Sequence, residues 1–115
     1  MRVISGSARG TVLHSIEDIS TRPTLDRVKE SLFNIIQNYI EDTTVLDLFA
    51  GSGAIGIEFL SRRAKQVYFC DKSSKAVAMI EKNLKKTKLK EKAIVYNKDG
   101  LKLAIKEIEN GDNLI

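Results

Sequence analysis

The sequence predicts an α/β fold in which helices alternate with the strands of a parallel sheet. Short apolar runs rich in β-branched and aromatic residues recur at 44–48, 67–70 and 93–96. Each run is followed by a stretch in which apolar residues recur at helical spacing. A glycine-rich turn at 51–56 joins the first strand to its helix. Because strand and helix alternate along the chain, we expect parallel strands joined by right-handed crossovers.

The composition indicates a single globular domain. The chain has 115 residues, of which 43% are hydrophobic and 30% are charged, and this balance excludes an intrinsically disordered protein. No apolar run approaches the roughly 18 residues of a membrane span, and residues 1–6 lack the long apolar segment of a secretion signal. Cys70 is the one cysteine, which excludes an internal disulfide and fits a reducing compartment. We therefore expect a cytoplasmic protein with no membrane partner.

The first twenty residues are expected to form a hairpin arm and a connector, ahead of a main domain at 21–115. β-prone residues at 3–4 and 11–13 are separated by a segment that contains Gly6 and Gly10. Such punctuation by glycine favours a short hairpin.

A long helix is expected to begin directly after Pro23, because proline disfavours a helical conformation in the residue before it. Thr24 or Asp26 is the expected cap of this helix. Phe33 and Tyr39 are expected to lie in the core. Apolar residues at helical spacing continue the helix: Val28, Leu32, Ile35, Ile36, Tyr39 and Ile40.

Three more helices follow in the predicted order. The first occupies 54–62, the second begins at Ser73, which is a suitable N-cap, and the third occupies 101–109. Residues 113–115 have the composition expected for the start of a fourth strand. No internal repeat or low-complexity tract interrupts this pattern.

Carboxylates stand at or near the ends of three successive strands, at Asp47, Asp71 and Asp99. In an open parallel sheet, ligands bind outside the carboxyl ends of the strands. A carboxylate after the second strand is placed to accept both ribose hydroxyls, and one after the third can accept from the exocyclic amine of an adenine. The pattern therefore predicts an adenosine-containing ligand. The alternative for each carboxylate is a structural cap on the turn or helix that follows it.

A dinucleotide is one candidate ligand, because Gly51-Ser-Gly-Ala-Ile-Gly56 has the dinucleotide spacing of glycines. An acid at Asp47, just before the first glycine, would repel a pyrophosphate, and Asp99 lies outside the dinucleotide pattern. S-adenosylmethionine fits better, because it has a ribose diol, a sulfonium and an amino group but no phosphate. A nicotinamide-dependent oxidoreductase remains the rival interpretation.

The glycine turn and the segments before it resemble known families. Asp47-Leu-Phe-Ala-Gly-Ser-Gly53 is similar to the first motif of the class I S-adenosylmethionine-dependent methyltransferases, which have a Rossmann-like parallel sheet. Five other segments resemble, in order and spacing, the RsmD-type 16S rRNA guanine-N2 methyltransferases of bacteria: Met1-Arg-Val-Ile-Ser-Gly6, Arg9-Gly10, Thr21-Arg-Pro-Thr24, Asp26-Arg-Val-Lys-Glu30 and Leu32-Phe-Asn34. The resemblance covers the whole chain.

The resemblance implies a set of cofactor contacts. Asp71 would hold the ribose hydroxyls with Lys72 beside it, and Asp99 with the Gly100 amide would meet the adenine. Five residues would surround the methionine part of the cofactor: Asp47, Phe49, Gly51, Ser52 and Gly53. A further segment would close over the methionine end and face the substrate: Arg22, Pro23 and Thr24.

The resemblance also implies contacts with rRNA, made by Arg2 and Arg9 on the arm and by Arg22. Residues 11 and 12 are Thr and Val, where family members often have a basic residue. Six lysines also lie within eleven residues, 82–92, where they form either a solvated surface or part of a field that attracts nucleic acid.

One family motif is missing from this sequence. The family presents its target amine with an Asn/Asp-Pro-Pro-Tyr/Phe loop after the fourth strand, whereas Pro23 is the one proline here. We expect this catalytic motif to lie beyond Ile115, in the longer enzyme. The chain is therefore expected to be the cofactor-binding portion, with strands one to three, the start of a fourth, and no catalytic residue or metal of its own. The sheet edge left uncovered in this way predicts self-association.

The expected function is S-adenosylmethionine-dependent methylation of the exocyclic N2 of a guanine in 16S rRNA, either free or in the assembled small ribosomal subunit. Two alternatives remain at this point. One is methylation of a different amine, such as adenine N6. The other is a non-catalytic RNA-binding module that uses the arm and the lysine cluster.

Overall fold

The computed structural model describes residues 1–15, 22–48, 50–97, 102, 105 and 106. For residues 22–25 it describes the backbone but not the side chains. Its elements in chain order are α1 (Arg22–Ile36), η2 (Gln37–Tyr39), β1 (Thr44–Asp47), α2 (Ala54–Ser61), β2 (Gln66–Cys70), α3 (Ser74–Thr87), η3 (Lys90–Lys92) and β3 (Ala93–Tyr96). The three strands and α2 match the predicted ranges to within one residue, and α3 begins directly after Ser73, the predicted cap.

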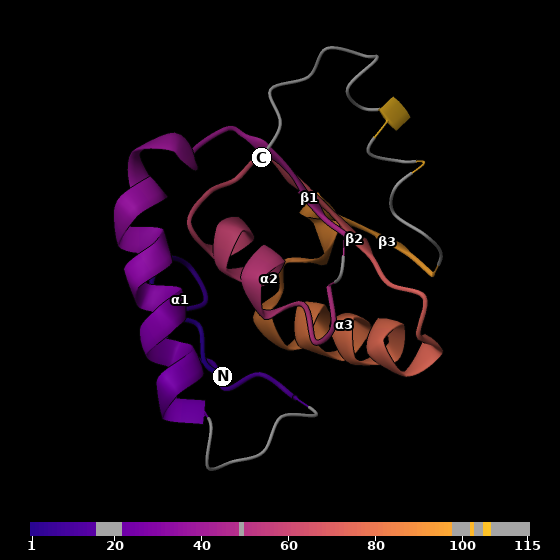
Figure 1. The fold of residues 1–115 in the computed structure, drawn as a ribbon, viewed down its shortest axis with the longest axis horizontal. Coiled ribbons are helices and arrows are strands. Elements are labelled where there is room, and N and C mark those ends of the chain that lie inside the picture. Colours follow the sequence, from indigo (N-terminus) through magenta and orange to yellow (C-terminus); the bar gives the residue numbers. More distant parts are fainter. Residues whose placement is uncertain (16–21, 49, 98–101, 103–104, 107–115) are drawn as a thin grey trace.

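The sheet is parallel, as predicted. Its order is β1-β2-β3, with Val45 beside Val67 and Phe69 beside Val95 in the register. Figure 1 shows α2 and α3 on the same side of this sheet, and α1 beyond α2. The three strands therefore end at a common edge, and the segments that follow them start from there.

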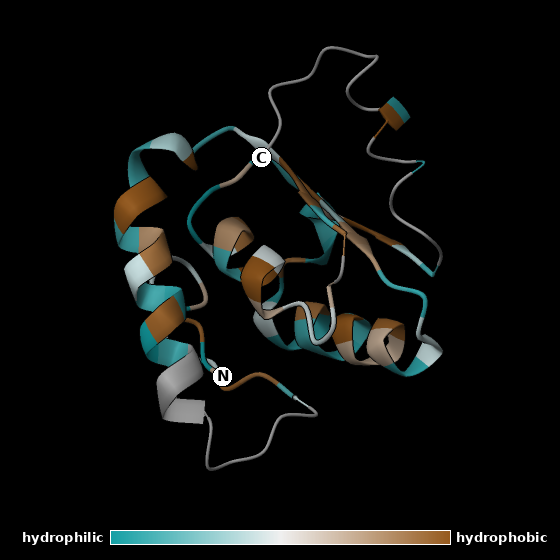
Figure 2. Ribbon diagram, viewed as in Figure 1, coloured by the Kyte–Doolittle hydropathy of each residue, from teal (hydrophilic) through white to brown (hydrophobic). Residues whose placement is uncertain are grey.

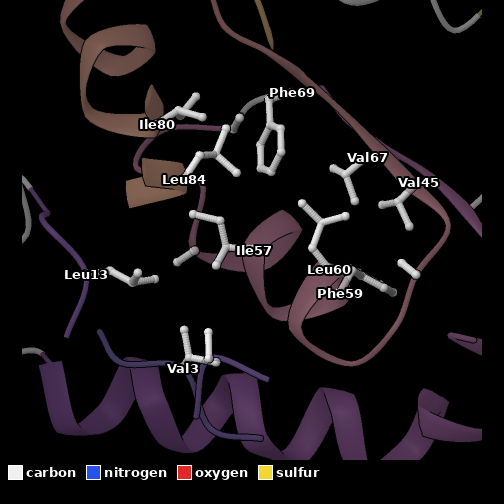
Figure 3. Packing of buried hydrophobic residues seen from close by; sticks show 14 of the residues in the cluster. Val3, Leu13, Val45, Ile57, Phe59, Leu60, Val67, Phe69, Ile80 and Leu84 are labelled. Atoms are coloured by element: carbon white, nitrogen blue, oxygen red, sulfur yellow. The ribbon is translucent and has the colours of Figure 1, made fainter. Parts of the chain in front are cut away.

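The core lies between the sheet and the two helices α2 and α3. Figure 3 shows Val67 and Phe69 of β2 facing Ile57 of α2 and Ile80 of α3. Gly56 allows α2 to approach the strand, because a Cβ there would lie 2.3 Å from Cε1 of Phe69. The third glycine of the turn therefore serves helix–sheet packing.

The N-terminal arm doubles back on itself, but it forms one isolated antiparallel bridge, between Arg2 and Val12, and not a regular hairpin. The Val3 amide donates to the Thr11 carbonyl (2.9 Å). Val3 and Leu13 are buried, and Figure 3 shows both on the α2 side of the arm. Because these apolar residues need cover, the arm packs along the domain instead of projecting from it.

The start of α1 differs from the prediction. The helix begins at Arg22, so Pro23 lies in its first turn, where the missing N–H of proline removes no helical hydrogen bond. Thr24 and Asp26 are inside the helix, so the prediction that one of them is its cap was wrong. Asp26 contacts the arm instead, where its Oδ1 accepts from the Arg2 amide (3.2 Å).

The buried side of α1 also differs from the prediction. Phe33 is buried as expected, but Ile35 is 76% exposed. The predicted helix ran to Ile40, whereas α1 ends at Ile36, and Tyr39 lies in η2, where it is 70% exposed and not in the core. Lys29 takes a fully buried position on the inner side, because Glu58 of α2 supplies a carboxylate for its ammonium. Figure 2 shows hydrophobic residues recurring along α1, so hydropathy did not reveal which of them face inward.

Aromatic packing joins α1 to α2. The rings of Phe33 and Phe59 meet edge to face with centroids 4.8 Å apart. The Arg62 guanidinium lies 4.8 Å from the centroid of the Phe33 ring. These contacts fix α1 against the helix that follows the glycine turn.

The last part of the chain leaves several predictions untested. The predicted helix at 101–109 and the fourth strand at 113–115 lie outside the described residues, apart from helical residues at 102, 105 and 106. Ile115 is also outside them, so the expectation that the catalytic motif lies beyond Ile115 stays a prediction. The boundary between an arm at 1–20 and a domain at 21–115 stays a prediction as well.

Candidate functional site

The turn between β1 and α2 has the conformation that its glycines suggested. Gly51 and Gly53 have φ values of 57° and 82°, in the left-handed region that favours glycine. The Gly53 amide donates to the Ala50 carbonyl (2.8 Å), and the Gly53 carbonyl accepts from Ile57, which makes Gly53 the N-cap of α2. The turn is thus tightly closed at its second glycine.

The two left-handed glycines face different surroundings. A Cβ on Gly53 would lie 3.3 Å from Ile80 and 3.4 Å from Phe69, so this position is packed against the core. A Cβ on Gly51 would meet none of the described residues within 4 Å. The described residues therefore leave space beside Gly51 at the carboxyl edge of the sheet, where a ligand could approach the backbone.

Asp71 connects this turn to the start of α3. Its Oδ2 accepts from the Gly51 amide (3.0 Å), and its Oδ1 accepts from the Ser73 amide (2.9 Å). The predicted N-cap is confirmed, because Ser73 Oγ accepts from the Ala76 amide (3.3 Å). An ionised carboxylate has about four acceptor sites, so two backbone donors leave Asp71 with capacity for a ligand. The capping and ligand-binding interpretations of Asp71 are therefore compatible.

Asp47 lies at the same edge, at the end of β1 and beside Phe69 in the register. Its Oδ2 is shielded from solvent. The Ala50 amide donates to the Cys70 carbonyl (3.1 Å), which extends the strand pairing beyond β1 and holds the glycine turn next to β2. The structure thus places Asp47 at the same edge of the sheet as the hydrogen bond between Gly51 and Asp71.

Sequence reasoning missed Asn83, a fully buried residue of α3. Its Nδ2 donates to the Ser52 carbonyl of the glycine turn (2.8 Å) and to the His14 carbonyl of the arm (2.9 Å). Its Oδ1 accepts from the His14 amide (2.7 Å). The available signal was an amide at the position before Leu84, on the apolar side of an otherwise amphipathic helix.

The remaining predicted site residues divide into three groups. Lys72 is exposed beside Asp71, and Ser52 and Gly53 lie in the glycine turn. Phe49, Asp99 and Gly100 lie outside the described residues. The first turn of α1 contains the predicted residues whose side chains the structure does not describe: Arg22, Pro23 and Thr24.

The two arginines of the arm lie away from the glycine turn. Arg2 and Arg9 line a surface hollow of about 470 Å³ together with Asp26, Arg27 and Glu30. Within the part of the chain that the structure describes, no group of three His, Cys, Asp or Glu residues is placed to hold a metal ion. Over the same residues, no helix has the length and apolar character needed to cross a bilayer.

All but the last residue of the chain matches a known protein family. The pattern of the family described as Conserved hypothetical protein 95 matches residues 1–114. The chain belongs to this family. Two curated relatives agree with the assignment. YlbH of Bacillus subtilis is 50% identical over 99 residues, covering 86% of this chain and 54% of that protein. Ribosomal RNA small subunit methyltransferase D of Haemophilus influenzae is 43% identical over 102 residues, covering 88% of this chain and 53% of that protein.

A solved structure confirms the fold class of this family member. The chain is 36% identical to yhhF from Escherichia coli, with a TM-score of 0.76, covering 90% of this chain and 55% of that one. The resemblance to RsmD-type methyltransferases and the Rossmann-like parallel sheet are thus confirmed. The chain spans about half the length of the curated relatives it matches.

Proposed function

We propose that this chain forms the S-adenosylmethionine-binding portion of an enzyme that methylates the exocyclic N2 of a guanine in 16S rRNA. The observation that carries the proposal is the hydrogen bond from the Gly51 amide to Asp71 Oδ2 (3.0 Å), at a glycine whose added Cβ would meet none of the described residues within 4 Å. The name of the Haemophilus influenzae relative supports rRNA as the substrate class. The residues that present the target amine are proposed to lie beyond Ile115.

This geometry favours S-adenosylmethionine over a dinucleotide. A pyrophosphate needs backbone amides that are free to donate to it. Here the Gly51 amide already donates to a carboxylate, and Asp47 places a second carboxylate at the same edge. Two negative charges beside the turn repel a diphosphate and attract the positively charged sulfonium and ammonium groups of S-adenosylmethionine.

We assign the cofactor contacts on this basis. Asp71 accepts from the ribose hydroxyls with Lys72 beside it, and Asp99 and the Gly100 amide meet the adenine. The methionine part is surrounded by Asp47, Phe49, Gly51, Ser52 and Gly53, and is covered by the segment Arg22, Pro23 and Thr24. The bound cofactor supplies an electrophilic methyl group, so the protein itself needs to orient the acceptor and to provide hydrogen bonds that make its amine nucleophilic.

The arm is proposed to contact the substrate RNA through Arg2 and Arg9, together with Arg22. The hollow that contains Arg2 and Arg9 also contains Arg27, and the guanidinium groups suit bidentate contacts with phosphate. The proposed substrate is 16S rRNA or the assembled small subunit, and the proposed location is accordingly the cytoplasm.

Calorimetry on the 115-residue chain tests this proposal. We expect S-adenosylhomocysteine to bind, NAD not to bind, and Asp71→Ala to remove S-adenosylhomocysteine binding. Asp42→Ala is the control, because Asp42 is exposed and precedes β1 at the opposite edge of the sheet. Binding of NAD without binding of S-adenosylhomocysteine would contradict the proposal and favour the oxidoreductase.

A further inference from the structure

We infer that a basic groove between the arm and α3 binds the sugar-phosphate backbone of the substrate RNA; this inference rests on the proposed function. The groove has a volume of about 270 Å³, and we call it the arm–α3 groove. Its lining comes from the end of the arm and from one side of α3: His14, Ser15, Lys75, Ala78, Met79 and Lys82.

The two lysines of the groove lie on one side of α3. Lys75 and Lys82 are seven residues apart, which is about two helical turns and about 10 Å along the axis. Both side chains are exposed, and Ala78 and Met79 form an apolar floor between them. Two cations separated by an apolar surface can contact phosphates while the floor packs against a sugar or base.

Among the described residues, no carboxylate lines the arm–α3 groove. The acid of α3 that is closest in sequence to Lys82 is Glu81, and its Oε2 is paired with Lys90 Nζ at 2.5 Å. Neither Lys75 nor Lys82 forms an ion pair with a described residue, so no described carboxylate neutralises their charges. This arrangement favours a polyanion over a ligand of mixed charge.

The wall of the groove is held in a fixed position. Lys86, one turn beyond Lys82, donates from Nζ to the Val12 carbonyl (2.6 Å). Asn83 binds the backbone of His14 on both sides, through the amide and the carbonyl. Figure 1 shows the end of the arm beside α3, where these contacts lie. The groove is therefore preorganised and needs little ordering when a ligand binds.

The arm–α3 groove also adjoins the cofactor turn. Asn83 holds the backbone of His14, which lines the groove, and also donates to the Ser52 carbonyl of the turn (2.8 Å). An RNA strand lying in the groove would therefore pass next to the site proposed for the methyl donor. A contact with the substrate RNA requires such a position. It distinguishes Lys75 and Lys82, which line the groove, from the lysines of η3, which do not.

The test measures binding of purified 16S rRNA to the 115-residue chain at salt concentrations between about 50 and 200 mM. The logarithm of the binding constant falls linearly with the logarithm of the salt concentration, and each phosphate contact that is removed makes this fall shallower by about 0.7 to 0.9. We expect Lys75→Gln and Lys82→Gln each to lower the slope by this amount, and the double variant to lower it by twice as much. Lys65→Gln is the matched control, because it removes one exposed lysine at the opposite edge of the sheet.

The outcomes separate the groove from the proposed function. Reduced slopes in the groove variants, with an unchanged slope in Lys65→Gln and unchanged S-adenosylhomocysteine binding in all variants, would support the groove. Equal slopes in the groove variants and the wild type, in a chain that still binds S-adenosylhomocysteine, would overturn the inference that the groove binds RNA but not the proposed function. Displacement of the RNA by polyglutamate at equal charge concentration would also overturn it, because the site would then be a general acidic-polymer site. Loss of S-adenosylhomocysteine binding by the wild type would contradict the proposed function itself.

Discussion

Lys29 Nζ and Glu58 Oε1 lie 3.2 Å apart, and both side chains are fully buried. Lys29 Nζ also donates to the Arg2 carbonyl (2.6 Å), while Glu58 accepts from the Ile4 amide (2.9 Å) and from Arg62 Nε (2.8 Å). This pair therefore joins α1, α2 and the arm through one carboxylate. A buried charge is tolerated at such a place because each ion has several partners.

Removing one member of this pair is expected to be costly. Glu58→Ala leaves the Lys29 ammonium buried without its carboxylate, and we expect a loss of about 3 to 5 kcal/mol in the free energy of unfolding. Urea denaturation measures the loss. Glu41→Ala, on an exposed residue, is the control. The double variant Lys29→Met/Glu58→Leu removes both charges. If Glu58→Ala lost less free energy of unfolding than this double variant, an unpaired buried charge would not be the cause of the loss.

Asn83 is expected to matter for both stability and cofactor binding. Asn83→Asp keeps the size but turns the donor toward the Ser52 and His14 carbonyls into an acceptor, which leaves those contacts repulsive. We expect a loss of about 1 to 3 kcal/mol in stability and weaker binding of S-adenosylhomocysteine, measured by calorimetry under conditions where the variant is folded. Asn38→Asp, on the exposed η2, should change neither quantity, and equal effects in the two variants would refute the assignment.

The glycines of the turn are expected to respond differently to alanine. Gly56→Ala forces a methyl group against Phe69, at an expected cost of about 1 to 3 kcal/mol, and Phe69→Leu should partly relieve it. Gly51→Ala meets no described residue, so its expected cost is the strain of a left-handed φ, about 1 to 2 kcal/mol, and Phe69→Leu should not relieve it. A double-mutant cycle by thermal or urea denaturation separates the two. Equal coupling to Phe69 at both glycines would show that the close approach is not specific to Gly56.

Self-association of the 115-residue chain stays a prediction. Among the described strands, β1 and β3 are the outer ones, and each has a partner on one side. An open strand edge can pair with another chain, so we expect dimers or larger species in light scattering as the concentration rises. Replacing Leu46 of the outer strand β1 with lysine should reduce the effect if the edge is responsible. A monomer at all concentrations would contradict the prediction.

Short-range patterns were sufficient for much of this protein. The strand at 93–96, the N-cap at Ser73 and the turn at Gly51 and Gly53 were all predicted correctly, because each depends on residues that are neighbours along the chain. The position of Asp47 and Asp71 at one edge followed as well, since parallel strands end on the same side of a sheet. The family resemblance of the motifs was also readable without coordinates.

Contacts between distant residues were not readable in this way. Asn83 and His14 are 69 positions apart, and Gly51 and Asp71 are 20 apart, so no local pattern indicates that they share a hydrogen bond. The inner side of α1 was likewise undetermined, because its apolar residues span more of the helix than α2 covers. The inner side of α1 is the side that contains the buried Lys29. The burial of Lys29 depends on Glu58, a carboxylate that α2 brings to within 3.2 Å of its ammonium. Periodicity and turn chemistry thus established the elements and the edge of the sheet where the site lies. Packing between elements determined which side chains build the site. The physical reason is that burial and hydrogen bonding depend on partners that the fold brings together from far along the chain.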